Sequence, residues 1–374
     1  MICSCGAGNA DGAVPIWDMY STCRHIEDNL IYFRLRLKPA GFSAESLGRG
    51  LRSAAWARGA GEEFYRGMAD KPIQGLYAAL LTPRRADDSV DETALTSLLE
   101  FLCQRGVRAY AVNGATGEFC LTAPDELKAI LRLVRKVVPG AKVLCGIGAA
   151  GIGKSMELAG IAADEGAQAY LLPMPYFFPY EQQDLEGFVE AVASRVKLPV
   201  LLYNLPEFTS EILPETACRL IRDLPNVIGI KDSGSSVATL RRLSAEQIPS
   251  CRIVGNDGIL TDALREGVCD GVVSGVACVL PELMSALLAE RAGSERFAHL
   301  EALLTDFRNQ LARFPVPWGL KWMAEARGIC AATFSQALTA SRRRQGEECI
   351  GWYRKWEASL QAIVTPDNAV AAKD

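Results

Sequence analysis

Histidine is scarce in this sequence: only two occur among 374 residues, His25 and His299. The first lies in the segment 1–67 and the second in a helical stretch near the carboxyl end, and neither is close to the end of a predicted strand. Zinc-dependent aldol chemistry normally uses histidine ligands, and a serine–histidine–aspartate triad needs a histidine by definition. We therefore predict no metal site and no triad of that kind.

Excess positive charge, long apolar runs and grouped metal ligands are also missing. The formal net charge is -4, which argues against a nucleic acid or an anionic membrane surface as a partner. No uninterrupted apolar stretch reaches the roughly 18 residues that a membrane span needs. The 12 cysteines lack the spacing of a metal site, so we interpret them as free thiols of a cytoplasmic protein.

From residue 73 onward, short apolar runs alternate with amphipathic stretches. The predicted strands begin near Ile73, Ala109, Lys142, Ala169, Pro199, Val227, Cys251 and Gly271. Predicted helices between them include 91–106, 123–138, 154–166 and 181–196, with Asp91 and Ser155 at starts and Gly106 and Gly166 at ends. This alternation is typical of an α/β fold, the (β/α)8 TIM barrel. A doubly wound open sheet is the alternative, but Leu81-Thr82-Pro83 stands where its glycine-rich dinucleotide loop is expected.

The barrel pattern divides the chain into four parts. We predict the barrel at 68–294 and a C-terminal helical appendage at 295–364. Residues 1–67 fit neither pattern and are predicted to be an N-terminal extension outside the fold. The small, polar residues 365–374 are predicted to form a frayed tail. The three predicted helices of the appendage cover 297–314, 318–327 and 347–363.

Two predicted strands end in residues whose side chains could take part in catalysis. One apolar run leads into Lys231-Asp232-Ser233-Gly234 and another into Tyr203-Asn204-Leu205-Pro206. Lysine is rarely buried without a partner or a task, and burial favours the neutral amine that can form a Schiff base with a carbonyl. The alternative is a lysine paired with a neighbouring carboxylate. Tyr203 is predicted to relay a proton, or else to pack as an aromatic lid.

Two further segments at strand ends carry polar groups. Gly114-Ala115-Thr116-Gly117-Glu118 can turn backbone N–H groups toward an anion such as a carboxylate, with the hydroxyl of Thr116 adding a hydrogen bond. The alternative is an ordinary tight turn, with Glu118 capping the helix that follows. Gly255-Asn256-Asp257-Gly258 offers polar groups to a substrate tail, or else caps a helix.

The segments 114–118, 203–206 and 229–232, taken together, resemble the three signatures of the dihydrodipicolinate synthase / N-acetylneuraminate lyase family. The resemblance covers about residues 70 to 360. It implies a TIM barrel with a C-terminal helical appendage, assembled as a homotetramer or homodimer. It also implies Schiff-base chemistry on a small 2-oxo acid without metal or organic cofactor. Lys231 would form the imine and Tyr203 would relay protons, while Thr116 and the backbone of Gly114 and Ala115 would hold the carboxylate.

The sequence departs from the synthases of this family at several points. Ala115 replaces the first of two threonines, and Phe177 stands where a tyrosine of a neighbour-reaching loop is found. Glu207-Phe208 occupies the stretch in which the synthases carry a carboxylate-binding arginine, so lysine biosynthesis is a disfavoured role. Gly275 lies where the sialic acid lyases place a serine. The Lys231–Gly234 segment is closer to members acting on 2-keto-3-deoxy sugar acids or 4-hydroxy-2-oxoglutarate.

We therefore predict a lyase, or class I aldolase, that cleaves a 2-oxo-4-hydroxy acid to pyruvate and an aldehyde. The alternatives are a dehydratase on a related acid, a synthase-like condensation, and a non-catalytic barrel that binds 2-oxo acids. Phe177 is the feature that keeps the last alternative open. The predicted substrate contacts beyond the imine and carboxylate groups are Asp232, Ser233, Asn256, Asp257 and Phe177.

Overall fold

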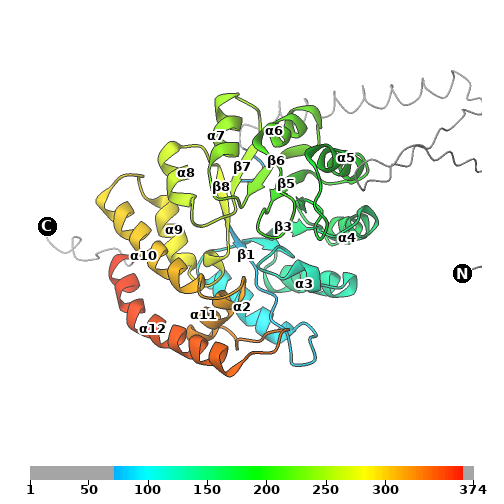
Figure 1. Ribbon diagram of the computed structural model, residues 1–374. Coiled ribbons are helices and arrows are strands. Elements are labelled where there is room, and N and C mark those ends of the chain that lie inside the picture. The colour runs from blue at the N-terminus through cyan, green and yellow to red at the C-terminus, as the bar shows by residue number, and fades with distance from the viewer. Residues whose placement is uncertain (1–70, 365–374) are drawn as a thin grey trace, which may run out of the picture. The chain divides into compact units, whose positions relative to one another are not determined.

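The barrel predicted from the sequence is confirmed. The computed structural model describes residues 71–364, in which eight parallel strands pair in chain order and close through β8 and β1 (Figure 1). Each strand begins within two residues of its predicted start. The segments 1–67 and 365–374 lie outside the described residues. The strands are β1 (Gly75–Ala79), β2 (Ala109–Val112), β3 (Lys142–Gly146), β4 (Ala169–Pro173), β5 (Val200–Asn204), β6 (Val227–Asp232), β7 (Cys251–Val254) and β8 (Gly271–Ser274).

Helices surround the strands on the outside of the barrel (Figure 1). They are α2 (Glu92–Gln104), α3 (Pro124–Val137), α4 (Ile152–Asp164), α5 (Gln182–Ala193), α6 (Pro214–Asp223), α7 (Ala238–Ala245), α8 (Leu260–Glu266) and α9 (Pro281–Ala289). Asp91 caps α2 as predicted, since its carboxylate accepts hydrogen bonds from two backbone N–H groups of the first turn. The prediction that Ser155 begins α4 is wrong, because the helix starts at Ile152 and Ser155 is buried inside it.

Side chains of the strands alternate between two apolar layers. In β5, Val200 and Leu202 belong to the layer that packs against the surrounding helices, whereas Leu201 and Tyr203 belong to the layer inside the barrel. Both faces of each strand are therefore buried, which explains why the strands read as continuous apolar runs in the sequence. The inner layer ends at the carboxyl ends of the strands, where polar residues replace apolar ones.

One irregularity in β6 decides where its lysine points. Val227 pairs with Val200 of β5, but the next pair joins Gly229 to Leu201, so β6 contains one extra residue, Ile228. Such a bulge reverses the inward and outward alternation beyond it. Gly229 adopts a φ of 153°, a conformation that side chains rarely permit. As a result Lys231, two residues further on, faces the barrel interior beside the inward side chain of β5 that it pairs with.

Three helices follow the barrel: α10 (Glu295–Leu311), α11 (Trp318–Ala326) and α12 (Ala340–Val364). They pack on one another and on α9 (Figure 1). The last helix begins seven residues before its predicted start at residue 347. A buried ion pair fastens this group to the barrel, because Nζ of Lys321 in α11 lies 2.6 Å from a carboxylate oxygen of Glu118 after β2. Glu118 therefore serves as an ion-pair partner, and its side chain does not cap a helix.

Two properties expected from the composition can be compared with the described part of the chain. No helix within residues 71–364 combines the length and the apolar character needed to cross a bilayer. The cysteines in the same range are all free thiols, and several of them are buried.

Replacing Gly229 by alanine is expected to destabilise the barrel. A Cβ at this position would meet the backbone nitrogen of Cys251 at 2.6 Å, and the φ of 153° would be strained in any case. We expect Gly229→Ala to lower the free energy of unfolding by about 3 kcal/mol, and with it the midpoint of thermal unfolding. Gly187→Ala is the matched control, since a Cβ there meets nothing within 4 Å. That variant should unfold at the same or a higher temperature; equal losses for both variants would contradict the role of the bulge.

Breaking the ion pair between α11 and the barrel should also be costly. Lys321 and Glu118 are only 4% and 11% exposed, so Glu118→Gln leaves a buried ammonium without its counter-charge. We expect this change to reduce the free energy of unfolding by about 3 kcal/mol in chemical denaturation. The double variant Glu118→Gln with Lys321→Met removes both charges and should regain at least half of the loss. A double variant that is less stable than the single one would show that the pair is not the cause.

Candidate active site

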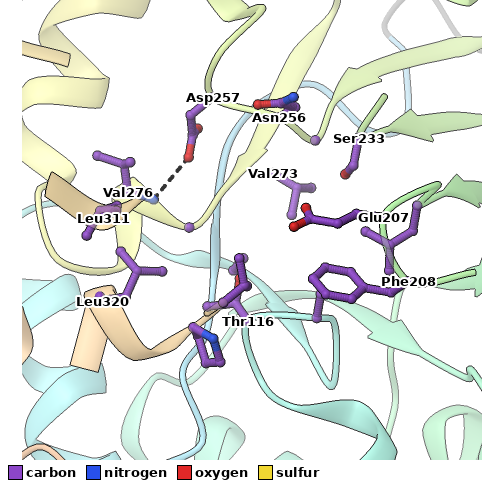
Figure 2. Close-up of a pocket in the computed structure, with 18 of the residues that line it drawn as sticks. Thr116, Glu207, Phe208, Ser233, Asn256, Asp257, Val273, Val276, Leu311 and Leu320 are labelled. Atoms are coloured by element: carbon purple, nitrogen blue, oxygen red, sulfur yellow. Dashed lines mark hydrogen bonds between the residues drawn. The ribbon is translucent and has the colours of Figure 1, made fainter. Parts of the chain in front are cut away.

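A cavity of about 450 Å³ opens at the carboxyl ends of the barrel strands. Its floor comes from strand ends, including Tyr203 of β5, Lys231 of β6 and Val273 of β8. One wall comes from the C-terminal helices, as Leu311 of α10 and Leu320 of α11 show in Figure 2. In TIM barrels this end carries the reacting groups, and a cavity of this size suits a small organic ligand.

The two residues predicted to carry the chemistry lie in contact at the base of the cavity. Lys231 pairs with Tyr203 across β5 and β6, and Nζ of the lysine stands 3.9 Å from the centre of the tyrosine ring. Both residues are nearly buried, at 3% and 2% exposure. Within residues 71–364 Lys231 forms no ion pair, so the alternative of a lysine held by a neighbouring carboxylate is not what the structure contains. A Cβ at Gly255 would lie 2.8 Å from Cε of Lys231, and this glycine thus makes room for the lysine.

The segment after β2 forms a tight turn at the edge of the cavity. The amides of Gly117 and Glu118 donate to the carbonyls of Gly114 and Ala115, each at 3.0 Å. The amides of Ala115 and Thr116 donate to no other group in the described residues. Ala115 and Thr116 line the cavity, whereas Gly114 closes the turn behind it. Two unused backbone donors beside a hydroxyl are suited to bind a carboxylate.

Asp232 was expected to contact substrate, but the structure places it behind the cavity. Its Oδ1 accepts a hydrogen bond from Nδ2 of Asn204 and another from the amide of Gly234, both at 2.9 Å. Oδ1 of Asn204 in turn accepts from the amide of Ile212. These bonds join the ends of β5 and β6, and Asp232 therefore fixes the loops that flank Tyr203 and Lys231.

Ser233, Asn256 and Asp257 all line the cavity, as predicted, but their hydrogen-bonding states differ. Both polar groups of Asn256 are used by the protein, since Nδ2 donates to Gly234 and Oδ1 accepts from Gly258. By contrast, Oγ of Ser233 and Oδ1 of Asp257 are buried and have no hydrogen-bond partner within residues 71–364. Figure 2 shows both side chains at the cavity, with Asp257 bonded through its other oxygen to the amide of Val276. These two oxygens are available to a ligand.

Burial raises the pKa of the Asp257 carboxyl. Four influences act in the opposite direction: the nearby hydroxyl of Ser274, the hydrogen bond from the amide of Val276, and the positive charges of Arg308 and Lys231. The upward effect of desolvation is the largest of these. Asp257 can therefore be protonated at a higher pH than an ordinary aspartate.

Phe177 does not line the cavity in this chain. Its side chain is 85% exposed and packs edge-on against Phe178, with ring centres 4.9 Å apart. The preceding Tyr176 turns inward instead, and the centre of its ring lies 5.6 Å from the centre of the Phe119 ring. A contact of Phe177 with a neighbouring subunit stays a prediction, because it requires a second chain.

One charged residue of the cavity was not predicted from the sequence. Glu207 lines the cavity in the stretch where this sequence lacks the arginine of the synthases (Figure 2). Arg308 enters the cavity from α10, about 100 residues further along the chain. The sequence predicted that this arginine lies in a helix. It did not indicate which face of that helix would point toward the mouth of the barrel.

Comparisons with known proteins identify the family of this chain. The model of the dihydrodipicolinate synthetase family matches residues 72–347, which include all three motif segments. A 4-hydroxy-tetrahydrodipicolinate synthase of Methylibium petroleiphilum is 32% identical over 273 residues, covering 72% of this chain and 93% of the relative.

Solved structures show the same architecture. A dihydrodipicolinate synthase of Acinetobacter baumannii complexed with pyruvate has a TM-score of 0.69 at 27% identity, covering 75% of this chain and 98% of its own. A prophage protein of Escherichia coli K12 from the dihydrodipicolinic acid synthase family, also complexed with pyruvate, has a TM-score of 0.69 at 26% identity, covering 76% of this chain and 99% of its own. The family match spans the whole barrel and its active-site end, and the chain belongs to the dihydrodipicolinate synthetase family.

Proposed function

We propose that this protein is a Schiff-base-forming lyase that cleaves a 2-oxo-4-hydroxy acid to pyruvate and an aldehyde. The observation that carries the proposal is Lys231, a nearly buried lysine without a carboxylate partner at the base of the cavity. An amine in this position can attack a carbonyl. The family of this chain includes proteins crystallised with pyruvate.

The chemistry follows from an imine at Lys231. Nζ attacks the C2 carbonyl of the substrate, water leaves, and a protonated imine forms. The proton of the C4 hydroxyl is then removed, the bond between C3 and C4 breaks, and its electron pair moves to the imine nitrogen to give an enamine. The C4 carbon leaves as the aldehyde. Protonation of C3 and addition of water then release pyruvate and regenerate the amine.

The surrounding residues have separate tasks in this scheme. Tyr203, in contact with the amine, relays the protons that leave the C4 hydroxyl and reach C3. Thr116 and the unused amides beside it hold the carboxylate next to the imine. Ser233 and Asp257 offer unpartnered oxygens to hydroxyl groups of the aldehyde half. No metal or organic cofactor has a part in the scheme.

A synthase-like condensation of pyruvate with aspartate semialdehyde is the second candidate. It is favoured by the name of the Methylibium relative and by the presence of Arg308, a cation that could hold the second carboxylate. Against it stands Glu207, which occupies the stretch of the cavity where the synthases of the resemblance carry their arginine. A dehydratase would share the imine but would release water without releasing pyruvate.

The imine can be tested directly. Incubation with pyruvate and borohydride should add the mass of a reduced pyruvyl group to the peptide that contains Lys231, because Lys231 is the lysine that lines the cavity among the described residues. Peptide mass spectrometry provides the measurement, and the exposed lysines provide internal controls. Lys231→Arg, shown to be folded by its thermal transition, should remain unmodified and inactive. If Lys231 of the wild-type protein remained unmodified, the result would contradict the imine mechanism.

The choice between cleavage and condensation is a matter of relative rates. We expect kcat/KM for pyruvate release from the best 2-keto-3-deoxy acid to exceed that for condensation of aspartate semialdehyde by at least about 100-fold, or about 2.7 kcal/mol. The reason is that buried Ser233 and Asp257 oxygens are satisfied by a hydroxylated substrate and left unpaired by aspartate semialdehyde. A panel of 2-keto-3-deoxy acids assayed for pyruvate and for dehydrated product makes the comparison. Similar values for cleavage and condensation would overturn the substrate assignment.

A further inference from the structure

Arg308 is the cationic group of the cavity that the scheme above leaves without a task. It lies on α10, outside the barrel, yet it lines the same cavity as Lys231. Its guanidinium forms no ion pair or hydrogen bond with any residue of the described range 71–364. Nearby arginines behave differently: Arg296 pairs with Glu290 at 3.7 Å and Arg313 pairs with Glu348 at 2.8 Å.

The loop after β7 makes room for this guanidinium. A Cβ at Gly258 would come within 2.8 Å of Cζ of Arg308, just as a Cβ at Gly255 would come within 2.8 Å of Cε of Lys231. Three residues of chain span at most about 10 Å. Both cations are therefore packed against one short loop, and one small substrate can contact them together.

The acids of the cavity do not neutralise Arg308. Two carboxylates line the cavity, those of Asp257 and Glu207, and neither pairs with it. Figure 2 shows Glu207 entering from the side opposite Leu311, which lies one turn after Arg308 on α10. The charge of Arg308 opposes the rise in pKa that burial causes at the Asp257 carboxyl, but the two groups form no ion pair within residues 71–364. An anionic group beside Arg308 would thus meet a guanidinium that no described residue holds in an ion pair.

We infer that Arg308 binds a second carboxylate at the far end of the substrate, so that the preferred substrate is a 2-oxo-4-hydroxy diacid. The planar guanidinium can hold a carboxylate through two parallel hydrogen bonds, which a terminal hydroxymethyl group cannot accept. Arg308 would thereby act as a specificity-determining residue supplied by the C-terminal helices. The inference rests on the proposed lyase function and adds the chemical class of the aldehyde half, an aldehyde that carries a carboxylate.

The test compares two substrates that differ at one carbon. 2-Keto-3-deoxyglucarate and 2-keto-3-deoxygluconate share a six-carbon chain and differ only in a carboxylate or hydroxymethyl group at C6. We expect the wild type to favour the diacid in kcat/KM for pyruvate release by at least about 30-fold. Arg308→Gln should remove most of this preference through KM and change the monoacid less than about threefold. Arg308→Lys, which keeps the charge but not the paired donors, should recover part of it.

Arg313→Gln is the matched control, because Arg313 lies just after the end of α10 and pairs with Glu348 outside the cavity. It should leave the preference unchanged, and thermal unfolding of each variant verifies that it is folded. A 6-phosphate ester of the monoacid separates carboxylate from phosphate recognition. Preference for that ester over the diacid, or an equal loss on both substrates in Arg308→Gln, would overturn the inference.

A binding measurement distinguishes failure of the role proposed for Arg308 from failure of the proposed lyase function. 2-Oxoglutarate and 2-oxovalerate have the same five carbons and differ in a terminal carboxylate or methyl group. The wild type should bind 2-oxoglutarate more tightly in calorimetry, and Arg308→Gln should abolish the difference while pyruvate is still trapped on Lys231. Loss of trapping in the wild type would refute the lyase; intact trapping with equal affinities for the two acids would refute only the role of Arg308.

Discussion

The proposed chemistry of this barrel depends on a nearly buried amine, that of Lys231, which still lines the cavity. An extra residue in β6 turns the strand so that Lys231 faces the barrel interior, and the positive φ of Gly229 allows that turn. Gly255 leaves space for the lysine stem, and the ring of Tyr203 lies under its amino group. If β6 were regular, the same lysine would point toward the surrounding helices and would not line the cavity.

The C-terminal helices belong to this site as much as the barrel does. The ion pair of Lys321 with Glu118 anchors α11 to the turn that carries Thr116, so a change in the packing of α11 would reach the amides of Ala115 and Thr116. From the same group of helices, Arg308 adds a positive charge to the cavity wall. In the proposed mechanism the barrel thus supplies the reacting groups, and the appendage supplies both a stabilising ion pair and a contact for the remote end of the ligand.

Much of this arrangement could be predicted from the sequence, for a physical reason. Each strand is buried on both faces, so apolar runs marked the strand starts, and parallel strands bring their carboxyl ends to one rim. That rim gathered Thr116, Tyr203 and Lys231 as expected. The same reasoning could not distinguish Asp232, which bonds to Asn204 behind the cavity, from its neighbour Ser233, which faces it. Arg308 was missed because helix rotation depends on packing between α10 and the barrel rather than on local pattern.

The location of the cavity's second cation has a consequence for how this family varies its substrates. In the synthases that the sequence resembles, an arginine follows the strand that carries the catalytic tyrosine; here Glu207 holds that stretch, while Arg308 reaches in from α10. The groups at the base of the cavity are left untouched by such an exchange, because they come from strand ends rather than from the helix. A fold can therefore keep one covalent chemistry and alter the remote specificity, since the two are carried by elements that pack independently. In this chain the charge proposed to bind the far end of the ligand comes from the appendage, whereas Lys231, the residue proposed to form the imine, is positioned by the bulge of β6.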